Sequence, residues 1–228
     1  MDERGEAARR TWLKLAAAGA LGTAGLSGWM SRALASGDLG GKEGVVKLDG
    51  TATVAGRPAK VGTIVAPGDR VTTGTDSQAV IVIGKDAFLL RSNTIVETRV
   101  RDGVLDQIVV GTGKILSVFA HRPVTIRAAN ATIGIRGTGC YIEVDPASVY
   151  FCLCYGEALV QGPRMQDKLV KTTHHESPLL LTEDSGIMGA KSGDFRNHTD
   201  AELIMLESLV GREPPFLKDG KVYPAGKY

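Results

Sequence analysis

The sequence predicts an all-β domain of many short strands, followed by one C-terminal α-helix. Three observations predict this class. Short runs rich in Val, Ile and Thr recur along the 228-residue chain, turn residues such as Pro67-Gly68-Asp69 and Arg101-Asp102-Gly103 separate them, and a helical apolar spacing occurs near the C-terminus. Such regular short strands favour a β-sandwich, a barrel or a β-solenoid, and the pattern does not choose among them.

The first 35 residues have the pattern of an export signal. Arg9-Arg10-Thr11-Trp12-Leu13-Lys14 resembles the twin-arginine motif, and an uncharged apolar segment at 15–30 follows it. Ala33-Leu34-Ala35 then forms an A-x-A cleavage site before Ser36. The sequence therefore predicts a periplasmic protein exported by the twin-arginine route, which carries proteins that are already folded, often with a cofactor in place.

The charge balance argues against a nucleic-acid partner. The chain has 27 Lys/Arg and 25 Asp/Glu, of which the signal segment holds five and three, so the remainder has 22 of each. A neutral mature chain offers no surplus of cations to neutralise phosphates. After the signal, no apolar stretch approaches the roughly 18 residues of a transmembrane helix. If the chain has a macromolecular partner, we expect an envelope protein.

The β pattern begins immediately after the signal. Val45–Leu48 and Thr51–Val54 flank Asp49-Gly50, which favours a hairpin with a type I′ turn. Gly111-Thr112-Gly113 indicates another turn. The remaining β-rich runs are Gln78–Ile83, Ala87–Leu90, Thr94–Val100, Leu105–Val110, Lys114–Phe119, Val124–Ala128, Cys140–Val144, Val149–Tyr155, Leu159–Gln161 and Lys168–Thr173.

The helix is predicted at about 199–211. Thr199 or Asp200 can cap its first turn, and Gly211 followed by Pro214-Pro215 ends it. Its apolar stripe consists of Leu203, Ile204, Leu206, Leu209 and Val210. The predicted organisation is thus a signal at 1–35, a β domain at 36–182 and a C-terminal extension at 183–228.

The β domain resembles the FecR-like domain family over about residues 44–161. The most specific match is Ile133-Gly134-Ile135-Arg136-Gly137-Thr138, close to the family's G-x-R-G-T stretch. The other matching segments are Gly44-Val45-Val46, Pro67–Gly74, Ser77–Ile83 and Leu89–Thr94.

The resemblance implies a periplasmic all-β domain, built as a sandwich or a solenoid. FecR-type signal transducers carry a cytoplasmic segment that controls a sigma factor, then a membrane span, then this domain. Here a signal peptide occupies the N-terminus, so the resemblance does not carry over the signalling role. It implies no catalytic residues.

Three cysteines and two adjacent histidines are the candidate chemical groups. Cys152 and Cys154 share a strand face in any register, because side chains alternate along a strand. A hairpin loop at 145–147 would set Cys140 opposite Cys152 and put all three thiols on one face, whereas a register shifted by one residue would separate Cys140.

These thiols, with His174 and His175, predict a Cys2His2 or Cys3His metal site for zinc, iron or copper. Both histidines can bind only if the chain turns between them, since neighbours on a regular strand face opposite ways. Two alternatives stay open: a Cys140–Cys152 or Cys140–Cys154 disulfide, and buried thiols without a role. His198 is interpreted as a helix-start residue and His121 as a surface residue.

The sequence carries no G-x-S-x-G or H-E-x-x-H motif, so an enzyme is not predicted. The favoured hypothesis is a non-enzymatic metal- or ligand-binding module of the cell envelope. The alternatives are a structural or interaction module stapled by a disulfide, and a redox protein that uses the Cys/His cluster.

Overall fold

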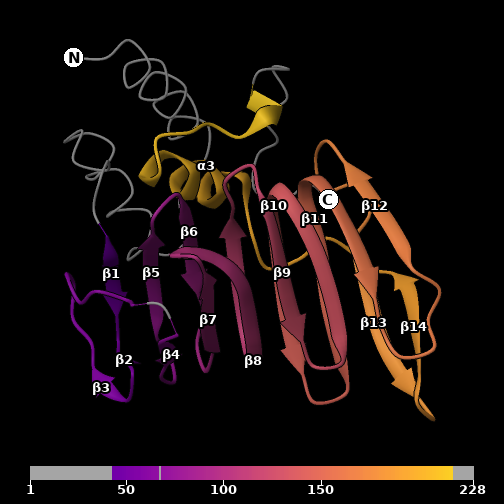
Figure 1. Ribbon diagram of the computed structural model, residues 1–228, viewed down its shortest axis with the longest axis horizontal. Coiled ribbons are helices and arrows are strands. Elements are labelled where there is room, and N and C mark those ends of the chain that lie inside the picture. The colour runs from indigo at the N-terminus through magenta and orange to yellow at the C-terminus, as the bar shows by residue number, and fades with distance from the viewer. Residues whose placement is uncertain (1–42, 67, 218–228) are drawn as a thin grey trace.

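The computed structural model describes residues 43–66 and 68–217, and Figure 1 shows their arrangement. These residues are mostly β-sheet with one α-helix near the C-terminus, which confirms the predicted fold class. The predicted signal, with Arg9, Arg10, Ala33 and Ala35, lies outside the described residues.

The strands are short at first and long in the middle of the chain. In order they are β1 (Gly44–Asp49), β2 (Ala52–Val54), β3 (Arg57–Pro58), β4 (Arg70–Thr73), β5 (Gln78–Ile83), β6 (Asp86–Leu90), β7 (Ile95–Arg101), β8 (Val104–Val118), β9 (Pro123–Ala128), β10 (Ala131–Asp145), β11 (Ser148–Gln161), β12 (Lys168–Thr172), β13 (Leu179–Asp184) and β14 (Ile187–Ser192). The helix α3 (Asp200–Leu209) and the 3-10 turn η1 (Pro215–Leu217) follow.

All described strands join in one sheet that does not close on itself. Its main path is β14-β13-β11-β10-β9-β8-β7-β4-β2-β3, a branch of β1, β5 and β6 joins at β8, and β12 pairs with β11. The long strands tie these parts together. The first half of β10 pairs with β9 and its second half with β8, so β10 belongs to two parts of the sheet at once.

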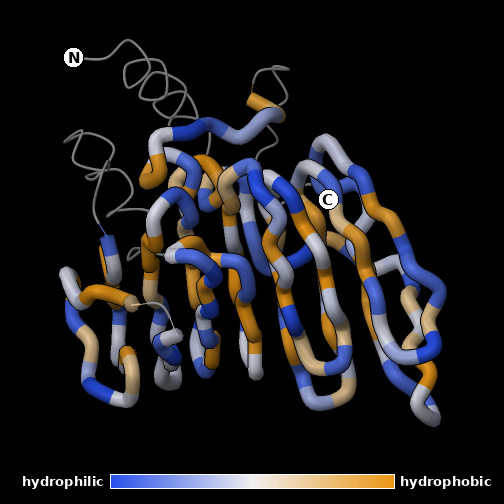
Figure 2. The backbone as a smooth tube through the Cα atoms, viewed as in Figure 1, coloured by the Kyte–Doolittle hydropathy of each residue, from blue (hydrophilic) through white to orange (hydrophobic). Residues whose placement is uncertain are grey.

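The sheet has apolar side chains on both faces, and Figure 2 shows hydrophobic residues recurring along the strands. One face forms an inner core to which nearly every strand contributes. The other face, over β5, β6, β8, β10 and β11, is covered by α3 and forms a helix-side cluster. Alternation along a strand separates the two: Ile142 of β10 lies in the inner core and its neighbour Tyr141 in the helix-side cluster.

The helix α3 begins and ends as the sequence predicts. Thr199 is its N-cap and forms a capping box with Glu202, in which each side chain accepts from the other's backbone N–H. Leu203, Leu206 and Leu209 are buried against the sheet. In the described part of the chain, no helix is both long and apolar enough to span a bilayer.

Two predicted turns behave differently in the structure. β1 pairs with β5 and β2 with β4, so Asp49-Gly50 does not close a hairpin but redirects the chain between two parts of the sheet. Gly111-Thr112-Gly113 lies inside the continuous strand β8. At Gly113 a Cβ would lie 2.5 Å from the Thr94 Cα, so glycine there allows close strand contact rather than a reversal.

The β-sheet extends beyond residue 182, where the sequence predicts the β domain to end. β13 crosses residue 182 and pairs with β14, two strands that the sequence pattern did not indicate. The chain then runs from β14 across the helix-side face to α3. This connection brings residues near position 198 against β11.

Candidate metal centre

Strand β11 places two predicted ligands together. Cys152 and Cys154 are two positions apart on it, with Leu153 between them, so both thiols face the helix side. Both side chains are fully buried. The shared face of this pair is as predicted.

Cys140 lies on the opposite face of the sheet. Asp145 pairs with Ser148, so the hairpin has a two-residue turn, and this register sets Tyr141 opposite Cys152. The predicted loop at 145–147 is therefore wrong by one residue, and a shift of one residue turns a side chain to the other face. Cys140 packs in the inner core, where it joins neither a metal site nor a disulfide with the other two thiols.

The loop after β12 supplies the first histidine. His175 has a φ of 55°, so the chain turns at this residue, as its participation requires. The Glu176 carboxylate accepts from the Thr173 amide at 2.8 Å, and the Glu176 amide donates to the Thr172 hydroxyl at 3.1 Å. The His175 amide donates to the Cys154 carbonyl at 3.0 Å, which ties the loop to β11.

The second histidine comes from the segment before α3. His198 precedes the N-cap Thr199, and its interpretation as a mere helix-start residue overlooked a contact with the thiols. Its Nε2 lies 3.4 Å from the Cys154 Sγ, although the two residues are 44 apart in the chain. No spacing rule joins residues so far apart, so only the tertiary structure reveals this ligand. His121 is exposed, as predicted.

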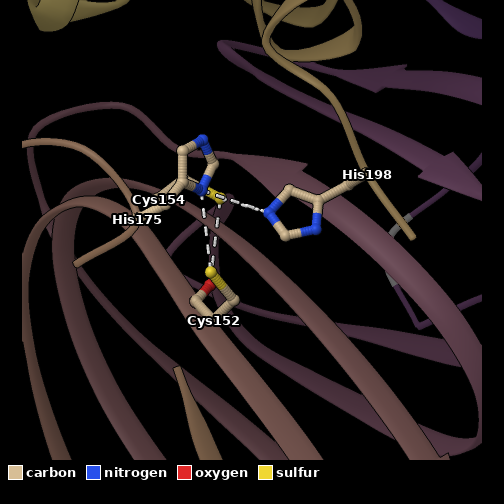
Figure 3. A group of neighbouring side chains, drawn as sticks. All are labelled: Cys152, Cys154, His175 and His198. Atoms are coloured by element: carbon tan, nitrogen blue, oxygen red, sulfur yellow. Dashed lines mark hydrogen bonds between the residues drawn. The ribbon is translucent and has the colours of Figure 1, made fainter. Parts of the chain in front are cut away.

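Cys152, Cys154, His175 and His198 form what we call the four-ligand cluster (Figure 3). One donor atom from each lies within 4.8 Å of all the others. The Cys152 Sγ is 3.6 Å from the His175 Nδ1, and that nitrogen is 3.2 Å from the His198 Nε2.

These separations fit a tetrahedral zinc ion. Zinc bonds of about 2.3 Å to sulfur and 2.0–2.1 Å to nitrogen set tetrahedral edges of about 3.5–3.6 Å between sulfur and nitrogen, and about 3.3–3.4 Å between two nitrogens. The observed sulfur–nitrogen distances of 3.6 and 3.4 Å and the nitrogen–nitrogen distance of 3.2 Å lie close to these edges. The three separations and the donor set are therefore compatible with a tetrahedral metal ion such as zinc, and the remaining donor atoms lie within 4.8 Å of one another.

An acceptor holds the far side of each histidine ring. The His175 Nε2 is 3.1 Å from an Asp200 carboxylate oxygen, and the His198 Nδ1 is 2.7 Å from the Arg196 carbonyl oxygen. Because these oxygens only accept, each ring carries a proton on its far nitrogen, and a ring in its neutral form turns a lone pair toward the cluster. Burial lowers the pKa of His175, but hydrogen bonds with Asp200 and Cys152 outweigh it and raise that pKa above its usual 6.5, so without an ion a second proton can occupy the inner nitrogen. Metal-bound histidines in proteins have this outer support.

His174, a predicted ligand, lies outside the four-ligand cluster. Its Nε2 is 2.9 and 3.0 Å from the two oxygens of Asp200. His174, His175 and Asp200 form a second compact group of donor atoms, but their separations are those of N–H···O hydrogen bonds. Burial lowers the pKa of His174, which keeps its ring neutral. We assign His174 to holding the Asp200 carboxylate rather than to binding an ion.

The two thiols of the cluster differ in acidity. Hydrogen bonding from the Cys154 thiol, helped by His175 and His198, lowers the pKa of Cys152 to about 3. Burial and the hydrogen bond to Cys152 raise the pKa of Cys154 well above its usual value. Thiolates are the metal-binding form of cysteine, and the cluster already stabilises one. Burial also raises the pKa of Cys140, which suits a packing role.

Aromatic rings enclose the cluster. Tyr141 stacks on His198 with ring centroids 4.6 Å apart, and Phe195 packs edge-on against His175 at 4.6 Å. Phe216 lies 4.5 Å from the His174 ring. With both thiols fully buried and the histidines 5% and 3% exposed, the four ligands form a closed site.

Comparisons with known proteins do not identify a family. No family model matches the chain, and the search of curated proteins gives no match. Among solved structures, two crystal structures of an anti-sigma factor candidate from Parabacteroides distasonis ATCC 8503 are similar, with 10% and 11% identity and a TM-score of 0.46. The similarity covers 55% of this chain and 60% of that one. A resemblance of this size assigns no function.

Proposed function

We propose that this protein is a non-enzymatic β module of the cell envelope that binds one transition-metal ion, zinc, through the four-ligand cluster. The observation that carries the proposal is the convergence of four donor atoms within 4.8 Å, with the far nitrogen of each histidine held by an acceptor. Two lone pairs that face each other 3.2 Å apart need a cation or a proton between them.

The donor set favours zinc over the other candidate metals. Two sulfur and two nitrogen donors in a tetrahedron are typical of zinc, which has no geometric preference of its own. Four protein ligands leave no open position for water or substrate, and such closed sites are structural. The iron and copper alternatives predict a coloured protein whose spectrum responds to a reductant.

The predicted export route supports the same proposal. A protein that crosses the membrane already folded can acquire its ion in the cytoplasm, where thiols stay reduced. The four-ligand cluster then reaches an oxidising compartment with both thiols held by the ion. On this proposal, the module acts in the envelope through its fold and a protein partner.

One observation favours a second function, thiol catalysis. Cys152, His175 and Asp200 follow one another in the thiol–imidazole–carboxylate order of cysteine enzymes, and the pKa of Cys152 is lowered. Against it, the Cys152 side chain is fully buried beneath α3. A catalytic thiol would react with iodoacetamide in the native protein, whereas a metal ligand at this depth would not.

Elemental analysis of the protein exported by its own signal tests the proposal. We expect about one zinc per chain in the wild type and in the control Cys140→Ala, and loss of zinc in Cys152→Ala and His198→Ala. The control removes a fully buried thiol of the same chain without touching the cluster. A metal-free wild type that also fails to take up zinc on refolding would overturn the proposal.

A further inference from the structure

The ligands of the four-ligand cluster come from two parts of the chain. Cys152, Cys154 and His175 belong to β11 and to the loop tied to it. His198 belongs to the segment that leads into α3. We call residues 194–217 the C-terminal lid, because they cover the helix-side face of the sheet.

The lid is held over the site independently of any ion. Leu203, Leu206, Leu209 and Phe216 are at most 3% exposed and pack on the sheet. Burying four large apolar side chains is a substantial driving force by itself. The lid therefore docks by the hydrophobic effect, and the ion does not have to recruit it.

Polar contacts, some of them exposed to solvent, hold the lid at both ends. At the start, Arg196 lies 2.9 Å from Glu143, and Arg91 lies 2.8 Å from Glu202 of α3. At the far end, Arg212 donates to the Lys85 carbonyl at 2.6 Å. Lid opening thus requires several apolar and polar contacts to break together.

We infer that the ion enters before the C-terminal lid docks and is trapped once it has docked, so that exchange of the ion is limited by opening of the lid. This inference rests on the proposed function. The docked lid contributes one ligand, His198, and part of the aromatic enclosure, through Phe195 and Phe216. With ligands at most 5% exposed, an ion has no route to solvent unless the lid moves.

The consequence concerns where the protein acquires its ion. The identity of a trapped ion depends on the metals available in the compartment where the chain folds, not on those in the compartment where it works. If folding precedes export, as the twin-arginine signal predicts, the ion comes from the cytoplasmic pool. The module then carries that ion into the envelope without equilibrating with metals there.

The test measures how fast excess EDTA removes zinc from the loaded wild type and from two leucine variants. Leu209→Ala weakens the lid at the end of α3 remote from His198, and Leu105→Ala makes the same truncation in the inner core. The two leucines are 3% and 4% exposed, so the truncations are matched. Opening of a part of a protein can be far more frequent than global unfolding.

We expect slow removal from the wild type, removal at least about tenfold faster from Leu209→Ala, and an unchanged rate for Leu105→Ala. Complete removal from the wild type within seconds would overturn the lid inference while leaving the bound zinc, and hence the proposed function, intact. Equal acceleration in both variants would also overturn it, because exchange would then follow global unfolding. Failure to find zinc before EDTA is added would instead count against the proposed function.

Discussion

The two faces of the sheet differ in what they bury. The inner core consists of apolar side chains from nearly all strands, and Cys140 packs there among Ile, Val and Phe residues. The helix-side cluster buries apolar residues too, but it includes Tyr141 and lies beside Glu143, three histidines and Asp200. Both regions contain cysteines with 0% exposure, yet only one surrounds them with partners that can hold a metal.

This difference shows that burial alone does not assign a role to a thiol. In the inner core a cysteine acts as a small hydrophobe, and its raised pKa keeps it protonated. On the helix side the same residue type faces imidazole nitrogens, whose outer atoms are fixed by further acceptors.

Loss of a ligand should have the largest effect. His198→Ala leaves three ligands, and the variant should lose its zinc on dialysis. With free zinc a thousandfold above the dissociation constant, bound zinc stabilises the fold by about 4 kcal/mol, or about 8–16 °C in Tm for a domain of this size. Differential scanning calorimetry with and without added zinc measures this difference in Tm, called the gap below. The gap should vanish in His198→Ala and persist in His121→Ala, whose histidine is exposed.

Removing the support behind a ligand should have an intermediate effect. Asp200→Asn weakens the acceptor that fixes the His175 ring, and outer partners of this kind contribute about 10–100-fold to metal affinity. Competition with a chromophoric chelator measures the dissociation constant. Asp200 also lies in the first turn of α3, so Glu202→Gln, which removes another first-turn charge and keeps a capping side chain, is the control. Equal losses in both variants would mean that the helix, not His175, was disturbed.

The sequence predicted most of the strands and the helix because both follow from local pattern, but it did not indicate β3, β4, β13 or β14. β5 matches its predicted span at both ends, and Thr199 caps α3 as expected. Pairing between strands was less predictable, since Asp49-Gly50 specifies a change of direction but not a partner for β1. The turn between β10 and β11 is one residue shorter than expected, and this single residue decides the face of Cys140.

In the candidate metal site, too, some residues follow from local sequence pattern and others depend on tertiary packing. The C-x-C pair shares a face by strand geometry, and His175 follows from the turn that its neighbours allow. His198 and the Asp200 support depend on the start of α3 and the segment before it lying against β11 and the loop after β12, which no local pattern encodes. The sequence therefore predicted three of the four residues of the cluster, and their binding of a metal stays a prediction.

Truncating the inner-core thiol should have a smaller effect. Cys140→Ala removes one sulfur atom from an apolar environment and should cost about 1 kcal/mol of stability. Zinc content and the chelator-removal rate should stay at their wild-type values. Urea denaturation gives the stability, and elemental analysis gives the zinc. Reduced zinc in this variant would show that the two faces of the sheet are coupled, against the separation argued above.

The smallest effect should be a change in acid sensitivity at the lid. Burial raises the pKa of Glu143, but hydrogen bonds from Asn197 and Tyr141, with the charges of Arg196 and Lys114, outweigh burial and lower it below its usual 4.5. A carboxyl with a lowered folded-state pKa contributes stability that is fully present above its unfolded pKa and is lost as the pH falls through the folded value. Glu143→Gln cannot ionise, so its stability should fall less steeply below pH 4.5 than that of the wild type.

Protonation of the metal ligands would obscure this slope, so the comparison belongs in the zinc-free Cys152→Ala background, with urea midpoints measured from neutral to acid pH. Glu157→Gln is the matched control. Glu157 pairs with Lys171 on the surface, where both side chains are more than half exposed and an ion pair contributes little. A Glu143→Gln slope equal to that of Glu157→Gln would mean that the Glu143 contact does not hold the lid. A shallower slope for Glu143→Gln alone would identify the Arg196–Glu143 pair as an acid-sensitive contact between the lid and the sheet.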